Sequence, residues 1–448
     1  MAAFKRSITN CFLSWKDHPN RKPLILKGAR QIGKSYTIRE FGKENFENII
    51  EINLEQQKKF NSLFATLEPE NICAQLSLEF NQRIIPQKTL LFIDEIQESS
   101  DAILSLRYFY EKMPELHVIA AGSLLDLSFN REKSMAVPVG RIEYQYMHPL
   151  SFREFLEAMG ENIALEFIDQ ISLKKNISQS IHEKFLNLFG QYLLCGGMPA
   201  VVKDFLASKS DLQYRKTQAD IIETFKDDFR KYRTRTELDK IEAVYESLSG
   251  HVAKQIKYTN LVPELGISTI KNIFNLLNLA KVIHIVRAAY ANGIPLGSEI
   301  NERYIKFIHL DIGLLNSLFG LNNQDIKHWN LDIHPAGALA EQAAGQEFLA
   351  YSDGFFQPKL FFWKRDYKGS DAEVDFLYTF ENKIFPIEVK SGSTGKLRSL
   401  KIFLAEKNCP LGIRVSQNQL SYTEKILSVP FYAISRLEEL IKECLLAL

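Results

Sequence analysis

Residues Gly28 to Ser35 have the order Gly-Ala-Arg-Gln-Ile-Gly-Lys-Ser, which fits the pattern Gly-x-x-x-x-Gly-Lys-[Ser/Thr] of loops that bind phosphate groups. The apolar stretch Pro23–Lys27 before the pattern suggests a short buried strand, and the residues after it have helical character. At such a strand-to-helix turn, backbone N–H groups and a helix N-terminus converge on an anion. The pattern therefore predicts a phosphate-binding loop, and the alternative is a glycine turn that binds nothing.

The residue types in this loop have distinct expected roles. The glycines let the backbone wrap closely around phosphates, Lys34 would reach the β- and γ-phosphates, and the Ser35 hydroxyl would hold Mg²⁺. ATP and Mg²⁺ are therefore the predicted ligands. The predicted nucleotide-binding residues are Gly28, Ala29, Arg30, Gln31, Ile32, Gly33, Lys34, Ser35 and Tyr36.

An acidic pair, Asp94 and Glu95, ends the apolar run Thr89–Ile93. Charged groups at the end of a buried strand are costly unless they have a partner or a function. We expect Asp94 to orient Mg²⁺ and its waters, and Glu95 to polarise the attacking water. The alternative is an acidic N-cap of a following helix.

Two further residues are candidates for the same catalytic site. Ser123 follows another apolar strand and could sense the γ-phosphate, or it could be an ordinary turn serine. Arg141 precedes a further strand and could complete the site as an arginine finger, in the same chain or from a neighbouring subunit. A plain surface arginine is the alternative for Arg141.

A second group of residues near the end of the chain could also do metal chemistry. The sequence predicts two strands joined by a polar turn. The first strand carries Glu373 and Asp375, and the second carries Glu388 and Lys390. Residues two apart share one face of a strand, so Asp375, Glu388 and Lys390 converge if the strands pair. Glu341 lies on a predicted helix upstream.

This set resembles the core of the PD-(D/E)XK nucleases, although the proline of that pattern is absent. The resemblance implies that Glu341, Asp375 and Glu388 hold Mg²⁺, and that Lys390 positions or activates a water. One alternative is a surface salt bridge on an exposed strand face. Another is a domain that keeps these residues as a platform for nucleic acid without cleaving it.

The elements that must position the first site alternate between strands and helices. Strands are expected at about 23–28, 48–54, 89–94, 116–122 and 142–147. Alternation of this kind predicts an α/β fold with a parallel sheet covered by helices on both faces. From about 150 to 235 apolar residues recur three and four apart, which predicts helices that either cover the nucleotide or simply form a core.

The next segment predicts a winged helix. Helices are expected over 240–252, 258–265 and 268–279, followed by two apolar strands with a loop between them. The last helix would place Lys271 and either Asn272 or Asn275 against DNA. The alternative is a winged helix used only for packing. This alternative is open because the last helix carries a single lysine, which is little positive charge for contact with DNA phosphates.

The composition sets limits on the chain as a whole. Its net charge is +1, so a nucleic-acid surface would have to be a local patch. The five cysteines are odd in number and none has Cys-x-x-Cys spacing, so neither a disulfide framework nor a zinc site is expected, and a cytoplasmic protein is the natural inference. No signal peptide or membrane-spanning run is recognisable.

Several motifs together resemble a prokaryotic family of AAA-type ATPases. They include "GARQIGKS", "LLFIDEIQ", "AAGSLL", "GRIEYQYMHPLSFREFL" and "CGGMPAVV". In that family an ATPase core precedes a C-terminal domain of unknown function, and many AAA proteins have Asn or Thr where this chain has Ser123. The expected domains are an ATPase core (1–150), a helical lid or linker (151–235), a winged helix (236–325) and a PD-(D/E)XK-like α/β domain (326–448).

The leading hypothesis is an Mg²⁺-dependent ATPase that acts on nucleic acid, most simply DNA, with a nuclease-like domain at its end. The alternative is an ATP-switched interaction protein that binds DNA or a protein partner and does not cleave. No membrane association is expected. Whether the chain forms a homo-oligomer or needs a protein partner stays open.

Overall fold

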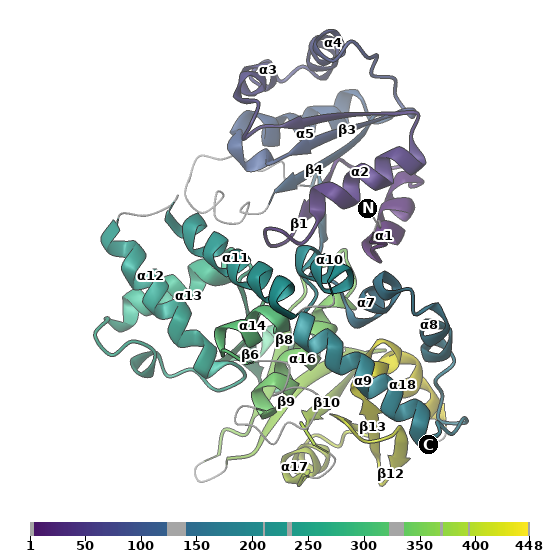
Figure 1. The fold of residues 1–448 in the computed structure, drawn as a ribbon, viewed down its shortest axis with the longest axis vertical. Coiled ribbons are helices and arrows are strands. Elements are labelled where there is room, and N and C mark those ends of the chain that lie inside the picture. Colours follow the sequence, from purple (N-terminus) through teal and green to yellow (C-terminus); the bar gives the residue numbers. More distant parts are fainter. Residues whose placement is uncertain are drawn as a thin grey trace.

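The fold is described from a computed structural model. It describes residues 4–122, 140–208, 211–230, 235–321, 336–367, 371–392 and 395–446. Figure 1 shows a smaller sheet with its helices at one end of the molecule, a larger sheet at the other, and a layer of helices between them. The predicted α/β class is therefore observed.

The smaller sheet is entirely parallel, and its strand order is β2-β3-β4-β1-β5. The strands β3, β4 and β1 are adjacent and parallel, so their carboxyl ends lie side by side at the same end of the sheet. The predicted strands are all present: β1 (Leu24–Lys27), β2 (Asn48–Asn53), β3 (Thr89–Asp94), β4 (His117–Gly122) and β5 (Glu143–Tyr146).

Helices cover both faces of this sheet, as the α/β pattern predicts. Leu90 and Phe92 of β3 belong to one apolar core, and Leu91 and Ile93 belong to the other, because successive side chains of a strand point to opposite faces. The first core includes α1 (Ile8–Lys16) and α2 (Lys34–Asn45). The second includes α3 (Asn61–Phe64), α4 (Pro69–Glu79) and α5 (Ser100–Lys112).

The middle of the chain is helical, as its periodicity predicts. Its helices are α7 (Phe152–Met159), α8 (Asn162–Asp169), α9 (Gln179–Cys195), α10 (Pro199–Ala207), α11 (Asp211–Arg230) and α12 (Arg235–Leu248). Within the described ranges no single helix is long and apolar enough to cross a membrane; only α9 and α10 taken together reach that length and hydropathy, and they are bent by 118°.

The predicted helix over 258–265 is wrong. Only a short 3-10 turn forms, over Tyr258–Asn260, before α13 (Ile267–Leu279) begins. Pro263 explains the difference, since a proline lacks an N–H and disfavours a helical conformation of the residue before it. The segment therefore lacks the middle helix of the predicted winged helix.

The predicted wing is part of the larger sheet. The hairpin of β6 (Ile283–Ala289) and β7 (Ile300–His309) joins β8 (Leu360–Lys364), with Val286 opposite Leu360. The eight strands have the order β12-β13-β11-β10-β9-β8-β6-β7. This sheet therefore crosses the boundary that the sequence analysis drew at residues 325 and 326.

The remaining elements complete this half of the molecule. Its other strands are β9 (Glu373–Phe380), β10 (Lys383–Val389), β11 (Gly412–Ser416), β12 (Ser421–Thr423) and β13 (Ile426–Pro430). Its helices are α14 (Ile312–Leu318), α16 (Ala336–Ala350), α17 (Arg398–Glu406) and α18 (Leu437–Leu446).

One apolar core connects the two sheets through the helical middle. It contains Phe41 of α2, Phe155 of α7, Phe189 of α9, and Phe348 and Phe385 of the α16–β10 layer, all nearly or fully buried. Burial of apolar surface is the main favourable term in folding. The helices over 151–235 therefore pack as part of the body of the protein and do not form a detached linker.

Candidate functional site

The predicted phosphate loop connects β1 to α2, at the edge where the strands of the smaller sheet end. Gly33 is the N-cap of α2 and has a φ of 94°, a left-handed conformation that glycine adopts without strain. Gly28 packs tightly, since a Cβ atom there would lie 2.5 Å from the Met147 carbonyl oxygen. The two glycines of the pattern thus allow the sharp turn by which the loop leads from β1 into the N-terminus of α2.

Lys34, the first residue of α2, is buried within the loop. Its Nζ donates hydrogen bonds to the carbonyl oxygens of Gly28 (3.0 Å) and Ala29 (2.7 Å). Burial lowers the pKa of Lys34 to about 8, while the nearby charges of Glu95 and Asp94 act in the opposite direction. These two carboxylates favour the charged form of Lys34, and an ammonium group makes strong charge-assisted hydrogen bonds to phosphate oxygens.

Ser35 and Asp94 meet across the loop as predicted. The Ser35 Oγ donates a hydrogen bond to Asp94 Oδ2 at 2.8 Å, and the Asn53 Nδ2 lies 3.4 Å from the same oxygen. Asp94 is buried, which raises its pKa, whereas the bond from Ser35 lowers it. A hydroxyl and a carboxylate in contact are ligands of the type that Mg²⁺ prefers, so these two residues fit the predicted metal.

Glu95 follows Asp94 with a φ of 50°, in the left-handed region. A non-glycine residue in this conformation is uncommon and costs free energy, so such residues often mark functional sites. Gln97 donates a hydrogen bond to the Glu95 carboxylate. This conformation turns the chain directly after the strand. The charge of Glu95 partly offsets the lowering of the Lys34 pKa by burial.

The other predicted nucleotide-binding residues have different environments. Ala29 and Ile32 are buried, Gln31 is exposed, and Tyr36 is half-buried on α2. Arg30 forms an ion pair with Asp228 of α11. This pair ties the loop directly to the helical middle of the chain.

Ser123 lies outside the described residues, although β4 ends immediately before it. Arg141 lies at the opposite edge of the sheet from the phosphate loop, because β1 and β5 are parallel and Leu24 is paired with Glu143. Its Nε forms an ion pair with Glu111 at 3.0 Å. Arg141 therefore cannot act on the phosphate loop of its own chain, and a role in a neighbouring subunit stays a prediction.

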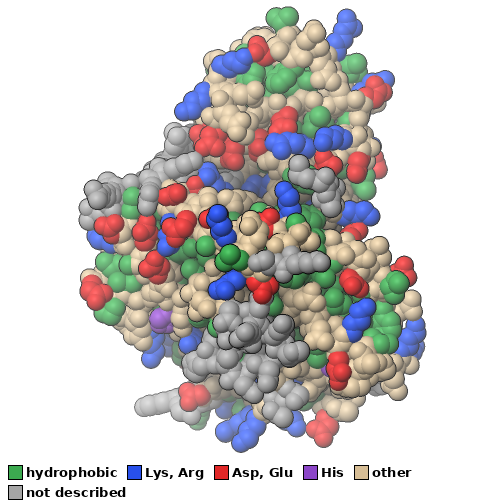
Figure 2. Space-filling model, in the orientation of Figure 1, with side chains coloured by type: hydrophobic (Ala, Val, Ile, Leu, Met, Phe, Trp, Pro, Cys, Tyr) green, Lys and Arg blue, Asp and Glu red, His purple; other side chains and the backbone are tan. Residues whose placement is uncertain are grey.

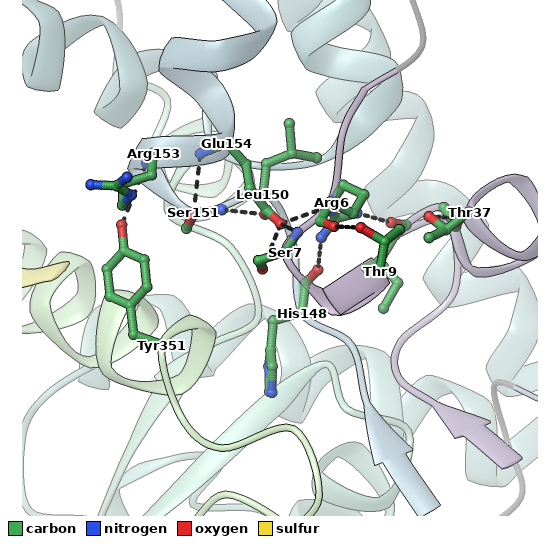
Figure 3. Close-up of polar contacts among 12 residues, drawn as sticks. Arg6, Ser7, Thr9, Thr37, His148, Leu150, Ser151, Arg153, Glu154 and Tyr351 are labelled. Carbon is green, nitrogen blue, oxygen red and sulfur yellow. Dashed lines mark hydrogen bonds and ion pairs between the residues drawn. The ribbon is translucent and has the colours of Figure 1, made fainter. Parts of the chain in front are cut away.

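Arg6 is a residue of this site that the sequence analysis missed. It is buried; its Nη1 donates to the Ile32 carbonyl oxygen at 2.9 Å and its Nη2 to the His148 carbonyl oxygen at 2.6 Å. Its Nε lies 3.2 Å from Glu154, which also accepts hydrogen bonds from Ser7. Figure 3 shows Arg6 and Ser7 of the N-terminal segment beside His148 and Glu154. No local pattern around Arg6 marks it, since its partners are distant in sequence.

The C-terminal set of residues does come together. The Asp375 Oδ2 of β9 accepts a hydrogen bond from the Val389 N–H of β10 at 2.8 Å. Lys390 donates to the Glu388 Oε1 at 2.5 Å. The pKa of Glu388 is raised to about 7, first by burial and then by the negative charge of Asp375.

A lysine that the sequence analysis did not consider lies among these carboxylates. The Nζ of Lys306 on β7 lies 3.3 Å from Glu341 Oε2 and 3.8 Å from Asp375 Oδ1, and it forms an ion pair with Glu373. Lys306 lies between the apolar residues Ile305 and Phe307, and it shares its strand face with the buried Ile308. A lysine within such an apolar strand is the sequence signal that could have indicated a buried lysine.

Metal binding by the C-terminal set is not evident from the geometry. In the ranges that the structure describes, no group of three or more His, Cys, Asp or Glu side chains is arranged to hold a metal ion. The predicted ligands Glu341, Asp375 and Glu388 are instead paired with lysines. Their assignment as a metal set stays a prediction.

The proposed DNA-reading residues lie on the outer face of α13. Lys271, Asn272 and Asn275 are exposed, and the Lys271 Nζ lies 5.4 Å from the centroid of the Tyr258 ring. Figure 2 shows acidic and basic side chains interspersed over the face of the molecule that it presents. An exposed position is compatible with contact to a partner, and DNA binding by these residues stays a prediction.

Three family models match consecutive parts of the chain. Residues 20–156 match an AAA domain. Residues 186–325 and 336–433 match two different domains of unknown function, DUF8612 and DUF4143. The segment that contains the phosphate loop is thus similar in sequence to AAA domains.

Solved structures resemble the chain only weakly. The Walker-type ATPase PABY2304 of Pyrococcus abyssi is 14% identical, with 70% of this chain and 96% of that chain covered and a TM-score of 0.46. The ORC1 protein of Aeropyrum pernix in complex with DNA is 9% identical, with coverages of 72% and 92% and a TM-score of 0.27. A RuvB variant of Thermotoga maritima is 13% identical, with coverages of 66% and 91% and a TM-score of 0.29. No curated protein sequence matches the chain.

Proposed function

We propose that the AAA-type domain binds ATP with Mg²⁺ and hydrolyses it. The observation that carries this proposal is the 2.8 Å hydrogen bond between Ser35 and Asp94, directly beside the buried Lys34. In proteins that bind a nucleoside triphosphate in a loop of this kind, these three positions hold the phosphates and the metal ion. The match of residues 20–156 to an AAA domain supports the same function.

Each of these residues has a role that follows from its chemistry. The N–H groups at the start of α2 would bind phosphate oxygens, and Lys34 would exchange its two carbonyl contacts for the β- and γ-phosphates. Ser35 and Asp94 would hold the metal ion, which supplies charge neutralisation for the phosphoryl group that is transferred. Glu95 would orient and polarise the attacking water.

The test is ATP turnover by the full chain with Lys34→Ala, compared with Lys43→Ala. Lys43 lies on the same helix but is exposed and pairs with Glu40, so its variant controls for loss of a lysine from α2. We expect turnover to be abolished in Lys34→Ala and retained in Lys43→Ala. Turnover at the parental rate in Lys34→Ala would show that the site is wrongly assigned.

For the rest of the chain we propose ATP-dependent action on nucleic acid or on a protein partner, without cleavage. The observation that favours this second function over a nuclease is the pairing of the predicted metal ligands with lysines. A surface that binds nucleic acid would have to be local, since the net charge is +1.

The test is incubation of labelled single-stranded, duplex and branched DNA with Mg²⁺ or Mn²⁺, with and without ATP. Binding whose affinity falls steeply with salt would support nucleic acid as the partner. Cleavage that is present in the parent and lost in Lys390→Ala would instead identify a nuclease. Absence of both binding and cleavage, despite ATP turnover, would favour a protein partner.

A further inference from the structure

We propose that Lys306 acts as a built-in cation that closes the C-terminal carboxylate cluster to divalent metal ions. The cluster consists of Glu341, Glu373, Asp375 and Glu388. Without the charge of Lys306, these carboxylates would be free to rearrange around a hard divalent cation such as Mn²⁺ or Mg²⁺. This inference concerns a site remote from the phosphate loop and does not depend on ATP hydrolysis.

The position of the ammonium group is the first observation. The side chain of Lys306 is only 4% exposed, and its Nζ contacts carboxylates from two elements: Glu341 of α16, and Glu373 and Asp375 of β9. The Nζ also lies 5.2 Å from the centroid of the Phe362 ring of β8. A single positive charge surrounded by three carboxylates and an aromatic face is where a metal ion would otherwise balance the negative charge.

The chemistry of the surrounding groups is the second observation. Side chains of Asp375 and Glu388 are 12% and 8% exposed, so their charges need compensation inside the protein. Mg²⁺, Mn²⁺ and Ca²⁺ take carboxylate oxygens as ligands. The cluster therefore offers the donor atoms that a hard cation prefers, and lysine is the group that competes for them.

One oxygen atom of the cluster has no hydrogen-bond partner among the described residues. The Oε1 of Glu388 accepts a hydrogen bond from Lys390, but its Oε2 is buried and makes no hydrogen bond to the described residues. A buried carboxylate oxygen without a partner is uncommon, and this one would be available to a cation once the charge of Lys306 is removed. Asp375 is already oriented, since its Oδ2 is held by the Val389 N–H and its Oδ1 faces Lys306.

The lysine and the carboxylates come from different parts of the chain. Lys306 lies on β7, opposite Val286 of β6, whereas Asp375 and Glu388 lie on β9 and β10. The sheet that continues from β7 to β10 brings them together. The hairpin β6–β7 therefore supplies the cation that balances the charge of the following domain.

The experiment measures Mn²⁺ binding to the full chain in the absence of nucleotide. The readout is the decrease of the electron paramagnetic resonance signal of free Mn²⁺. Four proteins are compared: the parent, Lys306→Met, the double variant Lys306→Met with Asp375→Asn, and Lys401→Met. Lys401 is an exposed lysine of α17 that pairs with Glu424, so its variant controls for the change in net charge.

We expect Lys306→Met to bind Mn²⁺ at least about tenfold more tightly than the parent, because a like charge no longer occupies the site. The gain should disappear in the double variant and be absent from Lys401→Met. A folded Lys306→Met that binds Mn²⁺ no better than the parent would overturn the proposal.

The parent protein provides a test that does not require Lys306→Met to fold. Mn²⁺ binding is measured on the parent and on Asp375→Asn and Glu388→Gln, which keep the shapes of the side chains. Equal, weak binding by all three supports a closed cluster. A Mn²⁺ site in the parent that either substitution removes would show that the cluster is open to metals, and the proposal would be wrong.

Discussion

The Nη1 of Arg6 donates a hydrogen bond to the carbonyl oxygen of Ile32, inside the phosphate loop, at 2.9 Å. The two residues are 26 positions apart, and α1 and β1 lie between them. The same guanidinium group reaches the His148 carbonyl oxygen and Glu154 (Figure 3). The N-terminal segment thus holds the phosphate loop against the chain that leads into α7.

Substitution Arg6→Ala should weaken nucleotide binding. It leaves the Ile32 and His148 carbonyl oxygens without their donor, and an unsatisfied buried acceptor costs about 1–3 kcal/mol. If half of this cost falls on the shape of the loop, the affinity for a fluorescent ATP analogue drops by about two- to tenfold. Lys5→Ala is the control, since Lys5 is exposed and pairs with Glu157. Equal affinity in the two variants would contradict this role of Arg6.

Substitution Ser35→Ala should remove the dependence of nucleotide binding on Mg²⁺. The hydroxyl that contacts Asp94 is lost, while the loop glycines and Lys34 remain. We expect ATP turnover to fall by at least about a hundredfold, as it does when other groups that stabilise charge in a transition state are lost. We also expect the nucleotide affinities measured with and without Mg²⁺ to become similar. Ser62→Ala is the matched control, because the exposed Ser62 hydroxyl donates to the nearby Lys59 carbonyl oxygen and takes no part in the phosphate site. Full turnover in Ser35→Ala would exclude this serine as a metal ligand.

Substitution Gly197→Ala should destabilise the protein by about 1–3 kcal/mol, the usual cost of overpacking a core. A Cβ atom at this position would lie 2.7 Å from the Leu150 nitrogen, where the Leu150 N–H donates to the Gly197 carbonyl oxygen at 2.7 Å. The loop after α9 and the segment before α7 would have to separate. Chemical denaturation measures the effect.

Gly250→Ala is the control for that substitution, because a Cβ atom there has no neighbour within 4 Å. We expect its free energy of unfolding to stay close to that of the parent. Similar losses in both variants would mean that close packing against Leu150 is not the cause.

The carboxyl group of Glu347 should make stability depend on pH. It is buried, it accepts hydrogen bonds from the Phe152 N–H and the Tyr192 hydroxyl, and burial raises its pKa from 4.5 to about 7. Between these values the folded chain binds more protons than the unfolded chain. Its stabilising contribution is therefore complete below about pH 4.5 and is lost as the pH rises through about 7.

Glu347→Gln removes this titration and nearly keeps the shape of the side chain. We expect the melting temperature of the parent to fall relative to that of Glu347→Gln as the pH is raised from about 5 to about 8. Thermal unfolding of both proteins in the same buffers measures the difference. A difference that is constant with pH would show that Glu347 does not titrate in this range.

Much of the phosphate site could be predicted from the sequence, because its chemistry lies in short contiguous segments. Lys34 and Ser35 follow a strand within one motif, and Asp94 and Glu95 end another strand. The carboxyl ends of adjacent parallel strands meet at one edge, so recognising the strands was enough to bring these residues together. The predicted helix over 258–265 does not form, because Pro263 lacks an N–H and disfavours a helical conformation of the residue before it.

Local sequence therefore determined which segments are strands and helices, and which of them carry a phosphate loop and an acidic strand end. Only the tertiary structure decided that Arg6 holds the loop, that β6 pairs with β8, and that Lys306 lies among the carboxylates of β9 and α16. Backbone conformation within a motif depends on neighbouring residues, whereas the partner of a buried charge depends on which distant segments pack around it. That choice is made when the whole core forms.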